Sequence, residues 1–407
     1  MFDLNYIVRE PLLDPKQQII GYELSVQHPE SDREIVTPAD DFRALASFVG
    51  QQMQDEANGW LLGTNKIFLK AVPALLGCEE VQALPGEHVV LSVRLADLGE
   101  ADTLAMVKDL RAKGFGISLC EADAIAQDRT LLSVATHLEI QFATTDFPTQ
   151  AKIYGALKNS TVRMIARQIS SWKEYDSCAG LGLDAFIGNL YLTPRESTGA
   201  TTKGLNPGQV LILQLMDMVR KNADVRKLED VLKRDAALSY KLLRYINSAG
   251  FGLGAEIQSM RHAVAMLGYS PLYRWLSVLL ATASSGGQSA ILMHTAIVRA
   301  RFAELLGAAV LPKNEAENLF VAGMFSLLDR LLGVPMDDVL ENIQLSEPVT
   351  QALLHRDGMY GPFLKLAESG EFDNGPIAEL AEGLFIGPDK VNQAHNAALI
   401  WAQNLKL

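Results

Sequence analysis

The stretch from Leu228 to Leu280, LEDVLKRDAALSYKLLRYINSAGFGLGAEIQSMRHAVAMLGYSPLYRWLSVLL, predicts three linked helices and decides the fold class of the second half of the chain. Asp235 is a favourable N-cap, because its side chain can accept a hydrogen bond from the free N–H groups of a first turn. The apolar residues that recur behind it at helical spacing are Leu238, Leu242, Leu243 and Ile246. Lys241 and Arg244 fall on the opposite face, so this helix is expected to bury one side only.

Glycine and capping residues mark the ends of these predicted helices. The first helix should end in a glycine-rich elbow from Asn247 to Gly254, where a positive φ costs little. Ser259 can then cap a short helix that Gly268 closes. Ser270 with Pro271 starts the next helix, since proline suits a first helical position. Helix, elbow, short helix and helix together predict an all-α packing unit.

Two runs within this stretch, RDAALSYKLLRYINSAGFG and SMRHAVAMLG, resemble the HDOD domain. That domain is an all-helical module of bacterial signalling proteins, related to HD phosphohydrolases but without their metal site. The resemblance extends over roughly residues 209–407. It implies an all-helical HDOD domain in the second half.

Composition narrows the class of protein. The 407 residues suffice for two or three domains, and the net charge of −12 argues against a nucleic-acid partner. The three cysteines are scattered and odd in number, which favours a reducing compartment. No signal peptide is visible, and the longest apolar runs are too short for a membrane span. We therefore expect a cytoplasmic protein without membrane insertion.

The chain changes character near residue 195. Before it, short β-type runs alternate with helical ones, whereas almost everything after it has helical periodicity. Between them, RESTGATTKGLNPG is rich in Gly, Ser, Thr and Pro and has no apolar face. The predicted domains are therefore 1–195 and 209–407, with a linker at 196–208.

The first half predicts strands that alternate with helices. The strand candidates are Ile19–Leu24, Ile67–Lys70, Val89–Val93, Gly116–Cys120, Leu138–Phe142, Val162–Ala166 and Ala185–Gly188. The helix candidates are Ala39–Gln54, Ala101–Lys113, Gln150–Lys158 and Ser171–Gly180. Such alternation favours a parallel sheet, most simply a β/α barrel. Barrels of this kind usually take about 250 residues, so some elements should be shortened or missing. The predicted fold class is α/β plus all-α.

The first half also resembles an EAL domain, the barrel that hydrolyses cyclic di-GMP in active family members. REPLLDPKQQIIGYELSVQ resembles the start of that family, with Glu23, Leu24 and Ser25 standing where Glu-Ala-Leu is expected. GLGLDAFIGNLYLTP resembles its last strand and exit. The resemblance implies a shortened EAL-type barrel.

Active EAL domains bind two divalent cations through carboxylates and an amide at the strand ends, and these ions activate water. Carried over residue by residue, Glu23 survives as the first ligand. The expected Asn is Lys70 and the expected Glu of the next strand is Ser92. Positions that would bear an Asp-Asp-Phe-Gly motif hold the run from Cys120 to Asp123.

The remaining positions depart further from the family. The catalytic Lys and its neighbouring Asp fall on Glu139 and Gln141, and later glutamates fall on Arg167 and Ser170. A late Gln becomes Ile187, and an Arg that contacts phosphate becomes Gln27. We expect no metal pair, since the charge of two dications would stay uncompensated. A salt bridge to Lys70 is one reason for Glu23 to be retained.

The second half is expected to lack a catalytic metal as well. An HD enzyme needs one His, a His-Asp pair and a distant Asp around one metal. His294 stands where the first His would be, but Ser326 and Leu327 stand where the pair should close a Gly-Leu-Leu-His-Asp-like run. The run from His355 to Asp357 is expected to mark a helix C-terminus, where His and Arg suit the helix dipole. No cofactor is predicted.

These observations predict a non-catalytic signalling protein of the EAL–HDOD type that acts through contacts with other signalling proteins. An alternative is a receptor that binds cyclic di-GMP without cleaving it, and a less favoured one is a residual phosphodiesterase. Candidate ligand-binding residues at the barrel mouth are Glu23, Lys70, Arg94 and Arg167. A homodimer is compatible with the sequence.

Charge is distributed unevenly along the second half. Residues 204–244 carry eight Lys or Arg against five Asp or Glu, whereas residues 312–390 carry five against fourteen. Such asymmetry is usually a solvated surface. It can also steer a charged partner, or pair one end of the molecule with another.

Overall fold

The structure is a computed structural model that describes residues 5–27, 38–54, 65–120, 129–141, 146–193, 205–248, 257–283, 290–333, 335–341, 343, 345–371 and 375–405. By its internal contacts the chain forms two compact units. The barrel unit comprises Met1–Thr193 and Ser369–Ala378, and the helical unit comprises Pro194–Glu368 and Glu379–Leu407. Residues 196–204 of the predicted linker, 196–208, lie outside the described residues.

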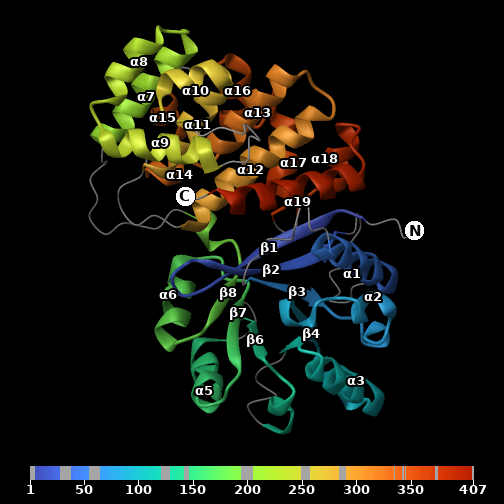
Figure 1. The fold of residues 1–407 in the computed structure, drawn as a ribbon. Helices are drawn as coiled ribbons and strands as arrows, with labels where there is room; N and C mark the ends of the chain where they lie inside the picture. The colour runs from blue at the N-terminus through green and yellow to red at the C-terminus, as the bar shows by residue number, and fades with distance from the viewer. Residues whose placement is uncertain are drawn as a thin grey trace. The chain divides into compact units, whose positions relative to one another are not determined.

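The barrel unit is a closed barrel of eight strands within the described residues, in the order β1 to β8 (Figure 1). The strands are β1 (Ile7–Leu13), β2 (Ile19–Val26), β3 (Lys66–Lys70), β4 (Val89–Val93), β5 (Gly116–Leu119), β6 (His137–Gln141), β7 (Arg163–Arg167) and β8 (Ala185–Ile187). The neighbours from β2 to β8 pair in parallel, while β1 is antiparallel to both β2 and β8. The predicted α/β barrel is confirmed, with one strand reversed.

Strand β1 was missed by the sequence reasoning. Its run IVREPLL contains two charged residues and Pro11, and proline usually argues against a strand with neighbours on both sides. In the structure Pro11 lies opposite Tyr22 of β2, and the strand is almost wholly buried. The antiparallel β1–β2 hairpin therefore opens a barrel that is otherwise built from parallel crossovers.

Five helices of the barrel unit lie within the described residues. These are α1 (Ala39–Gln54), α2 (Glu79–Gln82), α3 (Ala101–Ala112), α5 (Phe147–Leu157) and α6 (Trp172–Leu181). Four of them coincide closely with predicted helices, whereas α2 is a single turn. Helix α6 begins with a complete capping box, in which Ser171 and Glu174 satisfy each other's backbone N–H.

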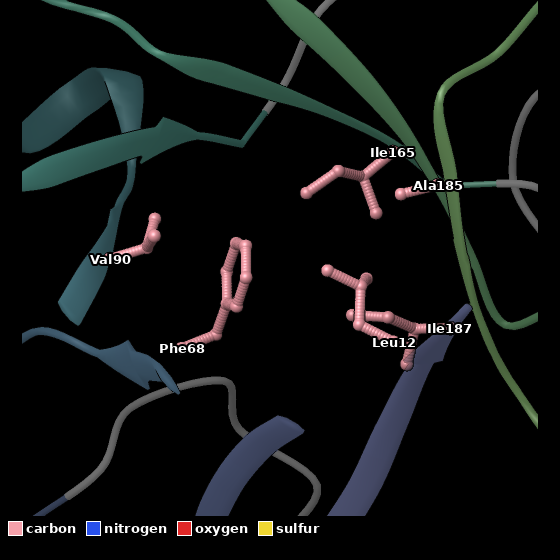
Figure 2. Packing of buried hydrophobic residues seen from close by; sticks show 6 residues of the cluster. All are labelled: Leu12, Phe68, Val90, Ile165, Ala185 and Ile187. Carbon is pink, nitrogen blue, oxygen red and sulfur yellow. The ribbon is translucent and has the colours of Figure 1, made fainter. Parts of the chain in front are cut away.

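An apolar cluster fills the barrel interior (Figure 2). Its members, contributed by five strands, are Leu12, Phe68, Val90, Ile165, Ala185 and Ile187. All are at most 3% exposed, so this layer is a packed core and leaves no pore. Ile187, which stands where the EAL resemblance expects a Gln, belongs to this core.

Residues from late in the chain complete the barrel unit. Within the segment Ser369–Ala378, the carbonyl of Gly370 accepts a hydrogen bond from the Arg9 backbone N–H at 3.2 Å. The Gln27 side-chain amide donates to the carbonyl of Gly375, and its oxygen accepts from the Ile377 N–H at 3.2 Å. Gln27, the position of a phosphate-binding Arg in the EAL resemblance, thus serves to hold this segment.

The helical unit contains α7 to α19, shown in green to red in Figure 1. Its first helices are α7 (Pro207–Arg220), α8 (Val225–Leu232), α9 (Ala236–Ser248), α10 (Met260–Leu267) and α11 (Tyr269–Thr282). The central ones are α12 (Ala290–Ala308), α13 (Lys313–Phe325), α14 (Leu328–Leu332) and α15 (Met336–Glu341). The last are α16 (Glu347–His355), α17 (Gly361–Ser369), α18 (Ile377–Gly383) and α19 (Pro388–Asn404). The predicted all-helical second half is confirmed.

Capping in the deciding stretch follows the sequence closely. Asp235 accepts a hydrogen bond from the Leu238 N–H at 2.9 Å, and Ser259 accepts from the His262 N–H at 3.1 Å. Leu242 is fully buried, while Lys241 is exposed. Most of the predicted elbow, residues 249–256, lies outside the described residues. The sequence predicted that the next helix starts at Pro271. Helix α11 begins two residues earlier, at Tyr269.

Helices α12 and α13 form the packed centre of the helical unit. A Cβ on Gly323 would lie 2.5 Å from the Cα of Ala300, so only glycine permits this approach of the two backbones. Gly323 opens the run that resembles the metal-binding motif of HD enzymes. In this chain it serves helix packing.

Candidate functional site: a polar layer in the barrel

A layer of polar side chains lies directly beyond the apolar core of the barrel. Because alternate residues of a strand face the same side, Phe68, Val90 and Ile165 of the core are each followed two residues later by a polar member of this layer. The polar layer comprises Glu23, Lys70, Ser92, Ser118, Glu139 and Arg167. It lies toward the C-terminal ends of β3 to β7, where barrels of this kind place their sites.

Arg167 and Glu23 form the centre of the polar layer. The Arg167 Nη1 and Nη2 atoms donate to the two oxygens of Glu23 at 2.5 and 2.6 Å, a bidentate pair. The Lys70 Nζ atom lies 3.4 Å from the same carboxylate. Both oxygens of Glu23 are therefore occupied by cations of the chain itself, and the predicted Glu23–Lys70 salt bridge is present.

Glu139 is the second carboxylate of the polar layer. Its Oε1 atom accepts hydrogen bonds from Ser92 at 2.8 Å and Ser118 at 2.7 Å. Its Oε2 atom lies 3.2 Å from the Arg167 guanidinium and 3.5 Å from the Cys120 thiol. Arg167 thus bridges two buried carboxylates that come from strands on different sides of the barrel.

Ionisation in this layer is set by competition between burial and charge. Burial alone would raise the pKa of Glu23, but the charges and hydrogen bonds of Arg167 and Lys70 outweigh it and lower that pKa to about 2. Burial would likewise lower the pKa of Arg167, yet Glu23 and Glu139 raise it well above its ordinary value. Burial and the Glu139 charge raise the pKa of the Cys120 thiol, so it is not an activated nucleophile.

Arg94, the fourth predicted ligand-binding residue, lies apart from this network. It follows the last residue of β4, is 44% exposed, and donates to the two oxygens of Asp97 at 3.0 and 2.8 Å. The structure therefore joins Glu23, Lys70 and Arg167 in one network, while Arg94 forms a separate surface pair. Glu121 and Asp123 lie outside the described residues.

His137 lies beneath the polar layer and contacts the core. Its ring meets Phe68 edge to face, with centroids 5.2 Å apart. The Thr136 Oγ1 atom accepts from the Ile117 N–H at 2.8 Å and lies 2.8 Å from Nδ1 of His137, within hydrogen-bond distance. Burial, aided by the charge of Arg163, lowers the pKa of His137 to about 4.

A second, partly buried ion cluster lies in the helical unit. Arg299 of α12 donates through Nη1 to Ser326 at 2.9 Å and to Glu368 at 3.0 Å. Arg356, in the left-handed conformation just after α16, donates through Nε to both oxygens of Glu368 at 3.1 Å. Ser326, where the HD resemblance expects a metal ligand, instead accepts from an arginine. The predicted helix end at His355 and Arg356 is confirmed.

His294 stands elsewhere on α12, and burial lowers its pKa to about 4, so its imidazole is neutral near pH 7. Among the residues that the structure describes, no three His, Cys, Asp or Glu side chains gather in a geometry suited to a metal ion. No described helix is both long and apolar enough to cross a membrane.

Part of the helical unit matches a known protein family. Residues 207–338 match the family model of the HDOD domain. The Bacillus subtilis protein YuxH, described as uncharacterized, is 25% identical over 413 residues, covering 98% of this chain and 98% of YuxH. The Vibrio cholerae cyclic di-GMP phosphodiesterase CdgJ is 25% identical over 369 residues, covering 90% of this chain and 84% of CdgJ.

Among solved structures, the PaMucR phosphodiesterase in complex with c-di-GMP is similar to 45% of this chain and 88% of its own, with 15% identity and a TM-score of 0.36. The Klebsiella pneumoniae protein BlrP1, in a manganese and cyclic di-GMP complex, is similar to 45% of this chain and 54% of its own, with 14% identity and a TM-score of 0.36.

The sequence predicted most members of the polar layer and one of its pairs, Glu23 with Lys70, but not the pairs that Arg167 forms. Glu139 was noted only as a departure from the EAL pattern, although the alternation in HLEIQ places His137, Glu139 and Gln141 on one face. In the structure Glu139 of that face joins the polar layer inside the barrel. The Arg167–Glu23 pair joins residues 144 positions apart, and only closure of the barrel brings them together.

Proposed function

We propose that this chain is a non-catalytic regulatory protein of the EAL–HDOD type, which acts through contacts with other proteins. The HDOD match over residues 207–338 supports the HDOD half of this class. CdgJ, similar over 90% of the chain, is named a cyclic di-GMP phosphodiesterase, so it supports a place in cyclic di-GMP signalling and not the absence of catalysis. The sequence resemblance of residues 1–195 to EAL domains supplies the other half of the assignment. Function is argued from the site, because one fold hosts active and inactive members alike.

The observation that carries the proposal is the Arg167 guanidinium on both oxygens of Glu23. Glu23 is the one carboxylate that the EAL resemblance retains as a metal ligand. A dication at Glu23 would have to displace the bidentate guanidinium and would then lie close to the charges of Lys70 and Arg167. The residues of this layer therefore do not fit a divalent cation.

The rest of the polar layer supports the same conclusion. Its two carboxylates, Glu23 and Glu139, pair with Lys70 and Arg167, and the charge of Glu10 on β1 also acts on Arg167. Binding two dications would leave an excess of positive charge in a buried space. Divalent sites for phosphate chemistry need carboxylates without competing cations.

A second candidate function is a receptor that binds cyclic di-GMP without cleavage. The observation in its favour is the Lys70 ammonium, which is 35% exposed and so can approach a phosphate from solution. Arg167 contributes little, because it is 10% exposed and committed to two carboxylates. Lys70 is already paired with Glu23, and a single paired cation is a weak phosphate site, so this function ranks second.

Hydrolysis is tested with purified full-length protein and cyclic di-GMP in either Mg²⁺ or Mn²⁺. We expect no linearised product above a control without protein. Product that Glu23→Ala abolishes and Arg94→Ala leaves unchanged would refute the proposal. Arg94→Ala is the matched control, because Arg94 is a cation near the end of β4 that pairs with Asp97.

Nucleotide binding is tested by calorimetric titration with cyclic di-GMP. If the protein acts through protein contacts alone, the titration should show no saturable heat of binding. Saturable binding that Lys70→Ala weakens and Arg94→Ala does not would establish the receptor function instead. The two candidates are thus separated by one experiment with the same control.

The metal content of the purified protein tests whether either unit binds a metal ion. Elemental analysis of protein purified without an affinity tag should give no stoichiometric iron, zinc or manganese. A reproducible one-to-one content that His294→Ala abolishes would contradict the role assigned to the helical unit. Loss of metal in Glu23→Ala would instead contradict that assigned to the barrel.

A further inference from the structure

Phe385, between α18 and α19, is the most exposed large apolar residue among those described, at 92%. It follows α18 in a Schellman motif. The Ile386 N–H donates to the Ala381 carbonyl at 2.9 Å, and the Phe385 N–H donates to the Glu382 carbonyl at 3.0 Å. Phe385 therefore occupies the residue just after the helix end that must adopt a left-handed conformation, with φ 58°.

The stability of the isolated chain does not explain this phenylalanine. Glycine is the usual residue at that position because a Cβ is strained there, and a bulky residue is a genuine outlier. Nor does the ring gain burial, since nearly all of it faces solvent. The neighbouring Ile386, by contrast, is 3% exposed and anchors the turn. An aromatic ring held out on a firmly anchored turn has the form of a contact for another molecule.

A complementary hollow exists on the same unit. A cavity of about 330 Å³ opens between α7, α11 and Ile343. Its lining is mainly apolar and includes Val210, Leu213, Met216 and Tyr273. That volume is roughly ten times the share of one water molecule in the liquid, so a single phenyl ring fits within it. Val210, at its rim, is 52% exposed.

The charges around the ring and the cavity have opposite sign. Exposed Glu379, Glu382 and Asp389 surround the turn that carries Phe385, with Lys390 as the nearby cation in sequence. Arg220 and Asp217 both line the cavity, and Asp217 pairs with Arg220 at 3.6 Å and with the following Lys221 at 2.7 Å. These three side chains together carry one net positive charge. The wider segments carry the same bias, with eight basic and five acidic residues over 204–244 but five and fourteen over 312–390. Attraction between such surfaces orients two molecules before they touch.

Ring and cavity lie on different parts of the helical unit, and Figure 1 shows α7 and α18 on opposite sides of it. We propose that two copies of this chain associate head to tail, with Phe385 of one copy inserted into the α7–α11 cavity of the next. This contact is heterologous, so it joins unlike surfaces and can extend from copy to copy. It is independent of whether the barrel binds or cleaves a nucleotide.

Sedimentation velocity of the full-length protein tests the contact. The average mass is expected to rise above the 44.4 kDa of one chain as concentration increases, and to rise less in ~0.5 M salt than in ~0.05 M. Phe385→Gly should weaken association by at least about tenfold, since it removes the anchoring ring. The same variant should melt no lower than the wild type, because glycine relieves the left-handed strain. Loss of association thus cannot be attributed to unfolding.

A mixing experiment tests the head-to-tail geometry. Val210→Glu keeps Phe385 but should likewise weaken association, because it places a charge at the cavity. Phe385→Gly keeps the cavity but lacks the ring. An equal mixture of the two variants should form a dimer that does not extend, since one intact ring meets one intact cavity.

Three outcomes would overturn the proposal: a wild-type protein that stays monomeric at high concentration, a Phe385→Gly variant that still associates, or a mixture of the two variants that stays monomeric. A wild-type monomer would leave the exposed ring to a different partner and remove the second copy as its occupant.

Discussion

The two units each contain an ion cluster, buried in the barrel and partly buried in the helical unit, and the clusters differ in their ratio of charges. In the barrel, Arg167 serves two carboxylates, Glu23 and Glu139. In the helical unit, the carboxylate of Glu368 serves two arginines, Arg299 and Arg356. In both, an arginine contacts a position where a resemblance expects a metal ligand. A guanidinium thus supplies the positive charge within the molecule itself.

The two clusters also differ in how far their side chains are exposed to solvent. Glu23 is 1% exposed and Arg167 is 10% exposed, so neither can turn to water if its partner is lost. Glu368 is 26% exposed and can recover hydration. Removing Arg167 should therefore lower the free energy of unfolding far more than removing one arginine next to Glu368.

The largest effect is expected for Arg167→Ala. It leaves the buried charges of Glu23 and Glu139 with Lys70 as the nearest cation of the layer, and breaking a buried pair typically costs about 3–5 kcal/mol. Chemical denaturation followed by circular dichroism measures the change in the free energy of unfolding. Arg94→Ala is the control, and its effect should stay within about 0.5 kcal/mol. Equal effects of the two variants would show that the polar layer contributes nothing to stability.

Leu242→Ala should produce a comparable loss in the helical unit. Leu242 is fully buried on α9, and deleting a buried leucine side chain typically costs about 2–5 kcal/mol. Calorimetry should resolve two transitions and show only one of them lowered. Lys241→Glu, on the exposed face of the same helix, should leave both unchanged. A single transition that moves as a whole would show that the two units unfold together.

The pH dependence of the barrel should come in part from His137. Its folded pKa of about 4 lies below its ordinary value of 6.5, so the unfolded chain takes up the proton first. The contribution of His137 to the free energy of unfolding is therefore fully present above pH 6.5. It is lost as the pH drops toward 4, and the loss amounts to about 2 kcal/mol at pH 5. His137→Asn should remove this dependence from the barrel transition. If the slope persists there, other groups cause it.

Lys70→Met should have the smallest effect on stability. The Lys70 ammonium is 3.4 Å from Glu23 and 35% exposed, so solvent screens the pair and its loss costs less than about 1 kcal/mol. Denaturation at low and high salt measures it, and the difference from wild type should shrink with salt. A loss as large as that of Arg167→Ala would place Lys70 at the centre of the network instead.

The sequence predicted the elements of this molecule better than their connections. Asp235, Ser259 and the periodicity around Leu242 predicted local structure, because caps and amphipathic faces depend on residues a few positions apart. The boundaries of α1 and β4 agree with prediction for the same reason. Strand β1 was missed because local propensity counts against Pro11 and two charges, whereas burial in the closed barrel outweighs them.

The membership of the candidate site was largely predictable, whereas its strongest pairing, Glu23 with Arg167, was not. Glu23, Lys70 and Arg167 were found by position along strands, but the same reasoning included Arg94, which turns to Asp97 three residues away. Glu23 was expected to pair with Lys70, and the stronger partner is Arg167. Which cation wins depends on the radius of the barrel and the register of its strands, and these are not local properties.

The segment Ser369–Ala378 has a consequence for how the protein is made. Gln27 of the barrel unit binds Gly375, a partner 348 residues later in the chain. At about 5–20 residues per second, a ribosome needs roughly 20–70 s to synthesise that interval. The first two strands therefore emerge long before the residues that complete their hydrogen bonds. During that time Gln27 and the Arg9 N–H depend on water or a chaperone, and a gene cut after residue 193 would prolong this state indefinitely.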